Sequence, residues 1–203
     1  QLREAARRGK KRLCLIAACG AGKTLMFSEI IRSAVALGKR AAVVAHRREL
    51  IDQTVEKLAR FGVESGVIMA SDSRADSYLP VQVCSVPTLA RRMHQLPPAD
   101  VLVIDEAHHS ASNSYKALLA CYPEAFVIGA TATPWRTDKI GLGDLFDDYV
   151  LAASPAELMR DGWLCPFDAY AYDSPALHEV RITAGDFNQK DLGIACNTDV
   201  LVG

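Results

Sequence analysis

A loop of small residues is the first segment whose residue types could perform chemistry. It reads Ala-Ala-Cys-Gly-Ala-Gly-Lys-Thr from Ala17 to Thr24, between an apolar segment and an amphipathic one. Glycines let a backbone fold tightly enough to aim successive N–H groups at phosphate oxygens, and the following helix adds the positive end of its dipole. A glycine turn that merely joins a strand to a helix would not need a lysine and a threonine in this order.

Each residue of this phosphate loop can be given a role. The Lys23 ammonium would reach the β and γ phosphates of ATP, and the Thr24 hydroxyl would bind Mg²⁺. The usual pattern begins with glycine, whereas Ala17 occupies that position, so the loop does not decide the matter by itself. The residues expected to bind the phosphates are Ala18, Cys19, Gly20, Ala21, Gly22, Lys23 and Thr24.

An acidic pair is the second candidate for chemistry. The apolar run from Val101 to Ile104 leads directly into Asp105 and Glu106. Open parallel sheets bind ligands at the carboxyl ends of their strands, so both carboxylates stand where a ligand is expected. Asp105 would hold Mg²⁺, directly or through water, and Glu106 would take the proton of an attacking water. The pair could simply start a helix, but its occurrence together with the phosphate loop favours an ATPase.

Three motifs in order make the chain resemble the first motor domain of superfamily 2 helicases of the DEAH-box kind. The family's first motif matches residues 17–24, its DEAH box matches 105–108, and its third motif matches 129–134. Segments 136–147 and 157–164 are similar to the bacterial and phage branch, which includes repair-type and restriction-linked motors. The resemblance implies a RecA-like P-loop NTPase domain that uses ATP and Mg²⁺ to unwind or move along DNA, less readily RNA.

The resemblance also implies roles that spacing alone does not show. His108, Thr131 and Thr133 would couple the state of the γ-phosphate to the nucleic-acid side of the domain. Threonine hydroxyls of this kind most often bind backbone groups instead, so these roles depend on the family. Arg47 and Thr88 would contact the sugar-phosphate backbone of DNA or RNA, which gives affinity without sequence preference.

The apolar pattern supplies the elements that would position these residues. Short runs rich in Val, Ile, Leu and Ala alternate with longer amphipathic stretches, which is typical of a parallel sheet covered by helices. The fold class is therefore α/β, with a mostly parallel central sheet and helices on both faces. Gly38, Gly62 and Gly162 stand where helices should end. We expect strands at 13–17, 41–45, 67–70, 81–84, 101–104 and 126–128, and helices at 24–37, 47–61, 88–94, 114–119 and 155–161.

One ATP-binding lobe followed by a linker is the expected domain organisation. Residues 1–165 are enough for a single substantial core, whereas the apolar rhythm weakens after Pro166. Residues 166–203 are expected to be a linker. By the resemblance, it leads towards a second RecA-like lobe that is absent from this chain and that would supply an arginine needed for hydrolysis. The chain alone is therefore expected to turn ATP over negligibly.

Composition excludes other classes of protein. The net charge of −1 argues against a protein that coats nucleic acid indiscriminately, although residues 1–60 hold 14 Lys and Arg against 5 Asp and Glu. No apolar stretch approaches the about 20 residues of a membrane helix, so no membrane partner is expected. The six cysteines are scattered without a secretory context, which predicts reduced thiols and a cytoplasmic protein.

Two other functions remain open at this point. Another phosphate-loop enzyme, such as a nucleotide kinase, would also bind a triphosphate, but a phosphotransferase has no need of Glu106 to activate water. The second alternative is a nucleotide-gated nucleic-acid-binding module without useful turnover. It is open because the expected second lobe is missing from the sequence.

Overall fold

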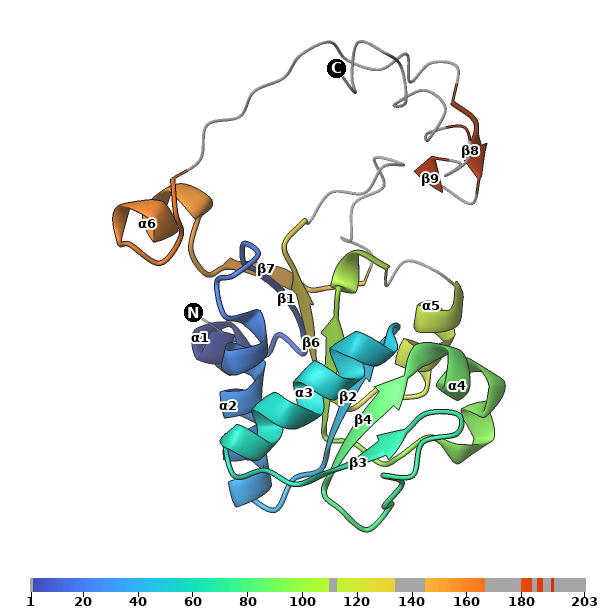
Figure 1. Ribbon diagram of the computed structural model, residues 1–203. Helices are drawn as coiled ribbons and strands as arrows, with labels where there is room; N and C mark the ends of the chain where they lie inside the picture. Colours follow the sequence, from blue (N-terminus) through green and yellow to red (C-terminus); the bar gives the residue numbers. More distant parts are fainter. Residues whose placement is uncertain are drawn as a thin grey trace.

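A seven-stranded sheet forms the centre of the computed structural model, which describes residues 2–109, 113–133, 145–166, 180–183, 186–187 and 191. The strand order is β3-β4-β2-β5-β6-β1-β7, and each neighbouring pair is parallel (Figure 1). The expected α/β class with a parallel sheet is confirmed. The strands are β1 (Arg12–Ile16), β2 (Ala41–Ala45), β3 (Ser65–Ile68), β4 (Val81–Ser85), β5 (Val101–Asp105), β6 (Phe126–Thr131) and β7 (Asp148–Leu151).

Helices cover both faces of the sheet, as expected. Helices α2 (Lys23–Ala36) and α3 (Arg48–Arg60) pack on one face, and α4 (Val86–Arg91) and α5 (Asn113–Ala120) pack on the other. No helix within the described residues has the length and apolar character needed to cross a bilayer. The shorter elements are α1 (Leu2–Arg7), α6 (Pro155–Arg160), the 3-10 turns η1 (Met93–Gln95) and η2 (Ala107–His109), and the antiparallel pair β8 (Ile182–Thr183) and β9 (Asp186–Phe187).

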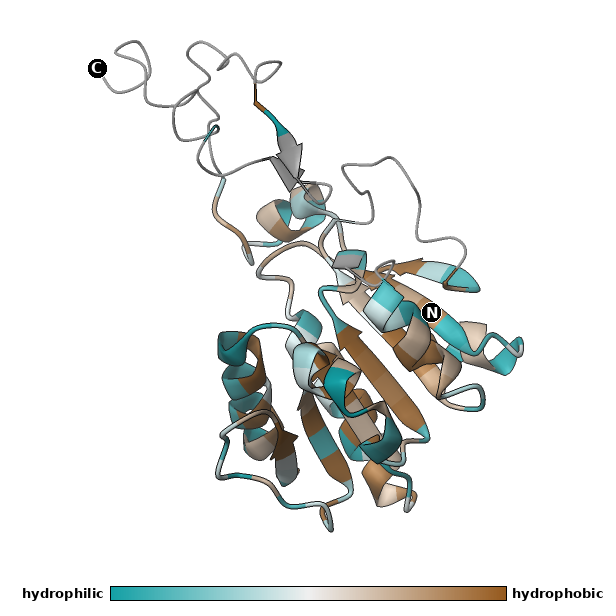
Figure 2. Cartoon of the chain, turned by 90° about the vertical axis from the view of Figure 1, so that its right-hand side faces the viewer, coloured by the Kyte–Doolittle hydropathy of each residue, from teal (hydrophilic) through white to brown (hydrophobic). Residues whose placement is uncertain are grey.

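Alternate residues of the buried strands contribute to two separate cores. In β2, Ala42 and Val44 join the cluster beneath α4 and α5, while Ala41, Val43 and Ala45 join the cluster beneath α2 and α3. Both faces of the strand are covered, which is why its sequence shows no polar alternation. Figure 2 shows hydrophobic residues along the central strands and hydrophilic residues on the outer sides of the helices and loops.

The structure departs from the expected elements mainly at the edges of the sheet. The third strand lies at 65–68 rather than 67–70, and the edge strand β7 was not expected at all. In β7 only Val150 is buried, because this edge strand lacks a covered second face. Gly38, Gly62 and Gly162 have φ values of 71°, 71° and 77°, which confirms them as C-terminal caps. The stretch 134–144 and most of the expected linker lie outside the described residues.

Gly129 in β6 is a position where any side chain would disturb the packing beside the acidic pair. A Cβ atom built there would lie 2.5 Å from Cζ of Phe146 and 2.9 Å from Cβ of Ala107, and both neighbours are buried. We expect Gly129→Ala to lower the free energy of unfolding by about 1–3 kcal/mol, because the neighbours must shift. Urea unfolding followed by circular dichroism measures this change.

Gly38→Ala is the matched control for that experiment. Unlike Gly129, Gly38 lies in the left-handed region, with a φ of 71°, and nothing lies within 4 Å of an added Cβ atom. Gly38→Ala should then lower the free energy of unfolding by about 1 kcal/mol, because alanine is strained in the left-handed region. A smaller effect at Gly129 than at Gly38 would show that β6 accommodates a side chain, contrary to the packing described.

Candidate functional site

The phosphate loop leaves the carboxyl end of β1 and turns sharply into α2. Gly20 and Gly22 have φ values of 80° and 78°, a left-handed backbone that glycine adopts readily. The Ala21 N–H donates to the Ala18 carbonyl at 3.1 Å within the loop, and the Ala17 N–H donates to the Thr131 carbonyl at 3.0 Å. The loop is therefore tied to the end of β6 and precedes a helix N-terminus, which is the arrangement that binds phosphate.

The Lys23 ammonium lies against the loop itself. Its Nζ donates to the carbonyl oxygens of Ala17 at 3.2 Å and Ala18 at 3.4 Å. Both acceptors are neutral, so a phosphate oxygen would form a stronger, charge-assisted hydrogen bond with the same nitrogen. Thr24 follows in the first turn of α2 and is half-buried. The lysine is thus held where an incoming phosphate would compete for it.

Asp105 ends β5 at the carboxyl end of the sheet, where the phosphate loop also lies. One strand, β6, separates them, with Asp105 in register with Ala130 and Ala130 in register with Leu15. Neighbouring strands are about 4.8 Å apart, so the end of β5 and the end of β1 are about 10 Å apart across the sheet. The positive charge of Lys23 also acts to lower the pKa of the Asp105 carboxyl. The two predicted elements therefore lie at the same end of the strands and interact electrostatically.

The environment of Asp105 fits a divalent cation. Burial raises the pKa of this carboxyl, which is 6% exposed, and the charge of Glu106 adds to the rise. The Glu106 N–H donates to its Oδ1 at 3.0 Å and opposes the rise, as do the charges of Lys23 and Lys57. A cation would favour the charged carboxylate. The Asp105 carboxylate and the Thr24 hydroxyl are oxygen donors of the type that Mg²⁺ prefers.

Glu106 occupies a strained turn between β5 and η2. Its φ is 52°, and among the described residues only Ser71 shares a positive φ without being glycine. Such a conformation costs about 1 kcal/mol and often marks a functional site. The Glu106 side chain is 32% exposed, and its Oε2 lies 3.2 Å from Nδ1 of His108. A carboxylate that is both held and reachable by water is suited to act as a general base.

The three residues assigned to coupling form one connected chain of contacts. His108 Nδ1 lies 3.2 Å from the Thr131 hydroxyl as well as from Glu106. The buried Thr131 hydroxyl donates to the Thr133 carbonyl at 3.1 Å and accepts from the Thr133 N–H at 3.1 Å. The structure therefore brings these residues together at the end of β6, and both Thr131 contacts to Thr133 are to its backbone. Their coupling role stays a prediction.

Arg47 and Thr88 are placed very differently. Arg47 is exposed just before α3 and lines a pocket of about 380 Å³ together with Glu106 and His108. Thr88 is 7% exposed, and its hydroxyl accepts a hydrogen bond from the Ala70 N–H at 3.2 Å. Arg47 can thus meet a ligand directly, whereas the Thr88 hydroxyl is engaged within the fold. The contacts of both residues with nucleic acid stay predictions.

His46 is a residue of this region that the sequence analysis did not single out. It lines the same pocket as Arg47, Glu106 and His108 and is half-buried. Burial lowers the pKa of its imidazole, and the charges of Arg47 and His108 lower it further. The signal that could have found it is its place directly after β2, because side chains that follow parallel strands gather at one edge of the sheet.

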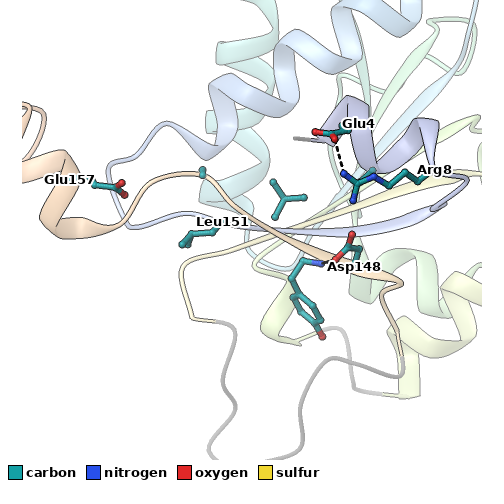
Figure 3. Close-up of a pocket in the computed structure, with 9 residues that line it drawn as sticks. Glu4, Arg8, Asp148, Leu151 and Glu157 are labelled. Atoms are coloured by element: carbon teal, nitrogen blue, oxygen red, sulfur yellow. Dashed lines mark hydrogen bonds and ion pairs between the residues drawn. The ribbon is translucent and has the colours of Figure 1, made fainter.

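A second pocket, of about 390 Å³, lies between α1, β7 and α6 (Figure 3). Its lining includes the carboxylates of Glu4, Asp148 and Glu157, with Leu151 on β7. Arg8 contributes a positive charge, but its guanidinium is paired with Glu4 at 2.6 Å. An acidic pocket of this kind repels phosphate, so the triphosphate is expected at the phosphate loop instead.

The sequence model of a protein family described as "Type III restriction enzyme, res subunit" (ResIII) matches residues 1–136. The chain belongs to the ResIII family. The matched residues contain the phosphate loop, the acidic pair, Thr131 and Thr133, so the ResIII match covers the candidate nucleotide site but not β7 and α6.

Several relatives of this ResIII chain carry helicase or restriction-enzyme names. It is 33% identical over 214 residues to "Putative ATP-dependent helicase IRC3" of Saccharomyces cerevisiae, covering 95% of this chain and 30% of that protein. It is 27% identical over 173 residues to a 51.5 kDa protein of a Lactococcus phage, covering 85% and 35%. It is 29% identical over 184 residues to the Type I restriction enzyme EcoAI endonuclease subunit of Escherichia coli, covering 84% and 22%. The chain spans about a third or less of each relative and carries a helicase-type ATPase domain.

Solved helicase structures share the fold of the ResIII domain. The UvsW helicase from Bacteriophage T4 aligns with a TM-score of 0.62 at 16% identity, covering 70% of this chain and 55% of that chain. The Pyrococcus furiosus Hef helicase domain aligns with a TM-score of 0.59 at 22% identity, covering 76% and 38%. At these identities the likeness establishes the fold alone, and it confirms the expected RecA-like architecture.

Proposed function

We propose that this domain is the ATP-binding lobe of a superfamily 2 motor of the DEAH-box kind, which hydrolyses ATP to unwind or move along DNA. The observation that supports the proposal is the placement of the Lys23 loop and the Asp105–Glu106 pair at the carboxyl end of the sheet. They follow β1 and β5, which are separated only by β6. A simple turn would need neither element, and a module that only binds nucleotide would not need Glu106 placed to activate water. Together the two elements provide a cation for phosphate, oxygen donors for a metal, and a base for water.

The described residues divide the work of binding and hydrolysis. The backbone from Ala18 to Thr24 holds the phosphates, and Lys23 exchanges its two carbonyl partners for phosphate oxygens. Thr24 and Asp105 hold Mg²⁺, which neutralises phosphate charge when bound. Glu106 then orients the attacking water and accepts its proton. His108 transmits the state of this carboxylate to Thr131 through the contacts at 3.2 Å.

The proposed partners follow from the same edge of the sheet. Arg47 contacts a sugar-phosphate backbone from the rim of the pocket next to Glu106. A second RecA-like lobe, reached through residues 166–203, closes over the nucleotide held by residues 1–165. Of the restriction-linked and repair-linked motors of the proposed branch, the names of the ResIII family and of the EcoAI relative support the restriction-linked kind.

Replacing Lys23 by Ala tests the nucleotide site in this chain directly. We expect ATP affinity in the presence of Mg²⁺ to fall about 10- to 100-fold, because a charge-assisted hydrogen bond to phosphate is worth roughly 1.5–3 kcal/mol. Titration with a fluorescent N-methylanthraniloyl-ATP measures the dissociation constant. Circular dichroism shows whether the variant keeps its fold.

Lys39→Ala is the control for this substitution. Lys39 follows α2 and pairs with Asp100 at 3.2 Å, at the other end of the helix from the phosphate loop. The Lys39→Ala substitution removes the same charge from the protein without changing the phosphate loop, so ATP affinity should be unchanged. Equal affinities in the Lys23 variant, the Lys39 variant and the original chain would refute the assignment of the phosphate loop.

A further inference from the structure

A leucine that follows α6 packs on the phosphate loop, although 144 positions separate it from the loop in sequence. A Cβ atom built on Gly20 would lie 3.0 Å from Cδ2 of Leu164. The methyl group therefore occupies the space beside Gly20 that a side chain would otherwise fill. Among the described atoms beyond the immediate neighbours of Gly20, only this one comes within 4 Å of that position.

The edge strand β7 brings this part of the chain to the loop. Leu151, the last residue of β7, is in register with Ile16, the last residue of β1. The pairing continues beyond the strand, where the Ala152 N–H donates to the Ile16 carbonyl at 2.9 Å. The chain thus leaves β7 at the point where the phosphate loop begins. Figure 1 shows α6 at the same end of the sheet as the loop between β1 and α2.

Helix α6 is fixed at its start by a reciprocal cap. The Ser154 hydroxyl accepts from the Glu157 N–H at 3.2 Å, and the Glu157 carboxylate accepts from the Ser154 N–H at 2.8 Å. This capping box satisfies two free donors and holds the first turn in one orientation. A helix of six residues is marginal by itself, so the cap helps to keep it formed.

The end of α6 turns the chain back so that Leu164 meets Gly20. Gly162 has a φ of 77°, its N–H donates to the Met159 carbonyl at 3.1 Å, and the Trp163 N–H donates to the Leu158 carbonyl at 2.8 Å. These two bonds are the Schellman pattern that ends a helix and reverses the chain. The Leu164 N–H joins the same Leu158 carbonyl at 3.1 Å. The position of Leu164 is therefore set by the backbone on both sides of α6.

We propose that Leu164 is a positioning residue for the phosphate loop, holding Gly20 from outside so that the loop is ordered before ATP binds. Lys23 fixes the start of the loop through Ala17 and Ala18, whereas Cys19 and Gly20 are exposed and gain little from burial. Ordering this part of the loop in advance lowers the entropy that nucleotide binding would otherwise lose. The nucleotide is ATP only if the proposed function is right, but the loop contact exists without it.

Nucleotide titration of the 203-residue chain tests the proposal. Leu164→Ala should weaken N-methylanthraniloyl-ATP binding about tenfold, and Leu164→Met, which refills the space, should restore it. Trp163→Ala is the control, because this neighbouring side chain is 77% exposed and a larger truncation. It should bind as the original chain does. Thermal melts show that the variants are folded, and Leu164→Val, with an effect of about threefold, replaces Leu164→Ala if that variant does not melt cooperatively.

Hydrogen exchange of the nucleotide-free protein separates this proposal from the proposed function. Amides of residues 18–22 should exchange faster in Leu164→Ala than in the original chain, while amides of β2 and β5 should not change. Equal exchange rates and equal nucleotide affinities in Leu164→Ala and the original chain would overturn the role of Leu164. An equal loss of affinity in Trp163→Ala would overturn it as well. An original chain that binds no ATP at all would instead overturn the proposed function, and the exchange rates would still decide whether Leu164 orders the loop.

Discussion

Single-turnover hydrolysis of ATP by these 203 residues alone should be about 10³- to 10⁵-fold slower than in a protein where a second motor lobe completes the site. The reason is the charge that develops on the transferred phosphoryl group. In the described part of this domain, Lys23 is the cation in the phosphate loop, and it lies on the β1 side of the site. An arginine from another lobe would stabilise the opposite side of the phosphoryl group. We therefore expect the domain by itself to bind ATP but to lack the charge that such an arginine would supply.

Rapid mixing of limiting ATP with excess protein measures this difference, with and without single-stranded DNA. The comparison is between this chain and a longer protein that carries the proposed second lobe, at concentrations that saturate binding in both. Matched dissociation constants are the control, because a rate difference then reports chemistry rather than occupancy. Hydrolysis by the chain alone within about tenfold of the two-lobe protein would show that this domain already contains a complete site.

The parts of the fold that sequence could predict are those encoded by local pattern. Every residue of the run from Val101 to Ile104 is apolar because β5 is covered on both faces. Asp105 follows this run at the end of the strand where ligands bind. The phosphate loop was predictable for the same reason, since its glycines and lysine act within a few residues of one another. Motif order then related the two elements before their places in the sheet were known.

Contacts between distant segments could not be read in this way. The strand β7 pairs with β1 across more than a hundred residues, and its half-exposed edge position gives no clear apolar pattern. Leu164 reaches Gly20 only because β7 and two helix caps direct it there. The burial of Thr88 was equally hidden, because its sequence neighbours do not show that its hydroxyl would accept a hydrogen bond from the Ala70 N–H. Contacts between distant segments placed β7 and Thr88, whereas Leu164 depends both on the pairing of β7 and on the local caps of α6.

Replacing Glu106 by Gln in the two-lobe protein should leave ATP affinity within about threefold of the original and reduce turnover about 10²- to 10⁴-fold. The amide has the same shape as the carboxylate and can keep a contact with His108, which now lies 3.2 Å from Oε2. It cannot accept a proton from water at neutral pH. Binding and hydrolysis should therefore separate, as expected when only the base is removed.

Glu49→Gln is the matched control for that prediction. Glu49 lines the same pocket as Glu106 and is exposed at the start of α3, so the same change removes one negative charge from the same surroundings. A fall in turnover confined to the Glu106 variant means that the loss is specific to the base and not a general effect of charge near Arg47. Equal falls in both variants would point to that general effect, and undiminished turnover in the Glu106 variant would exclude this carboxylate as the base. The two glutamates also differ in backbone, because Glu106 stands at a strained turn with a φ of 52°, as functional residues often do, and Glu49 does not.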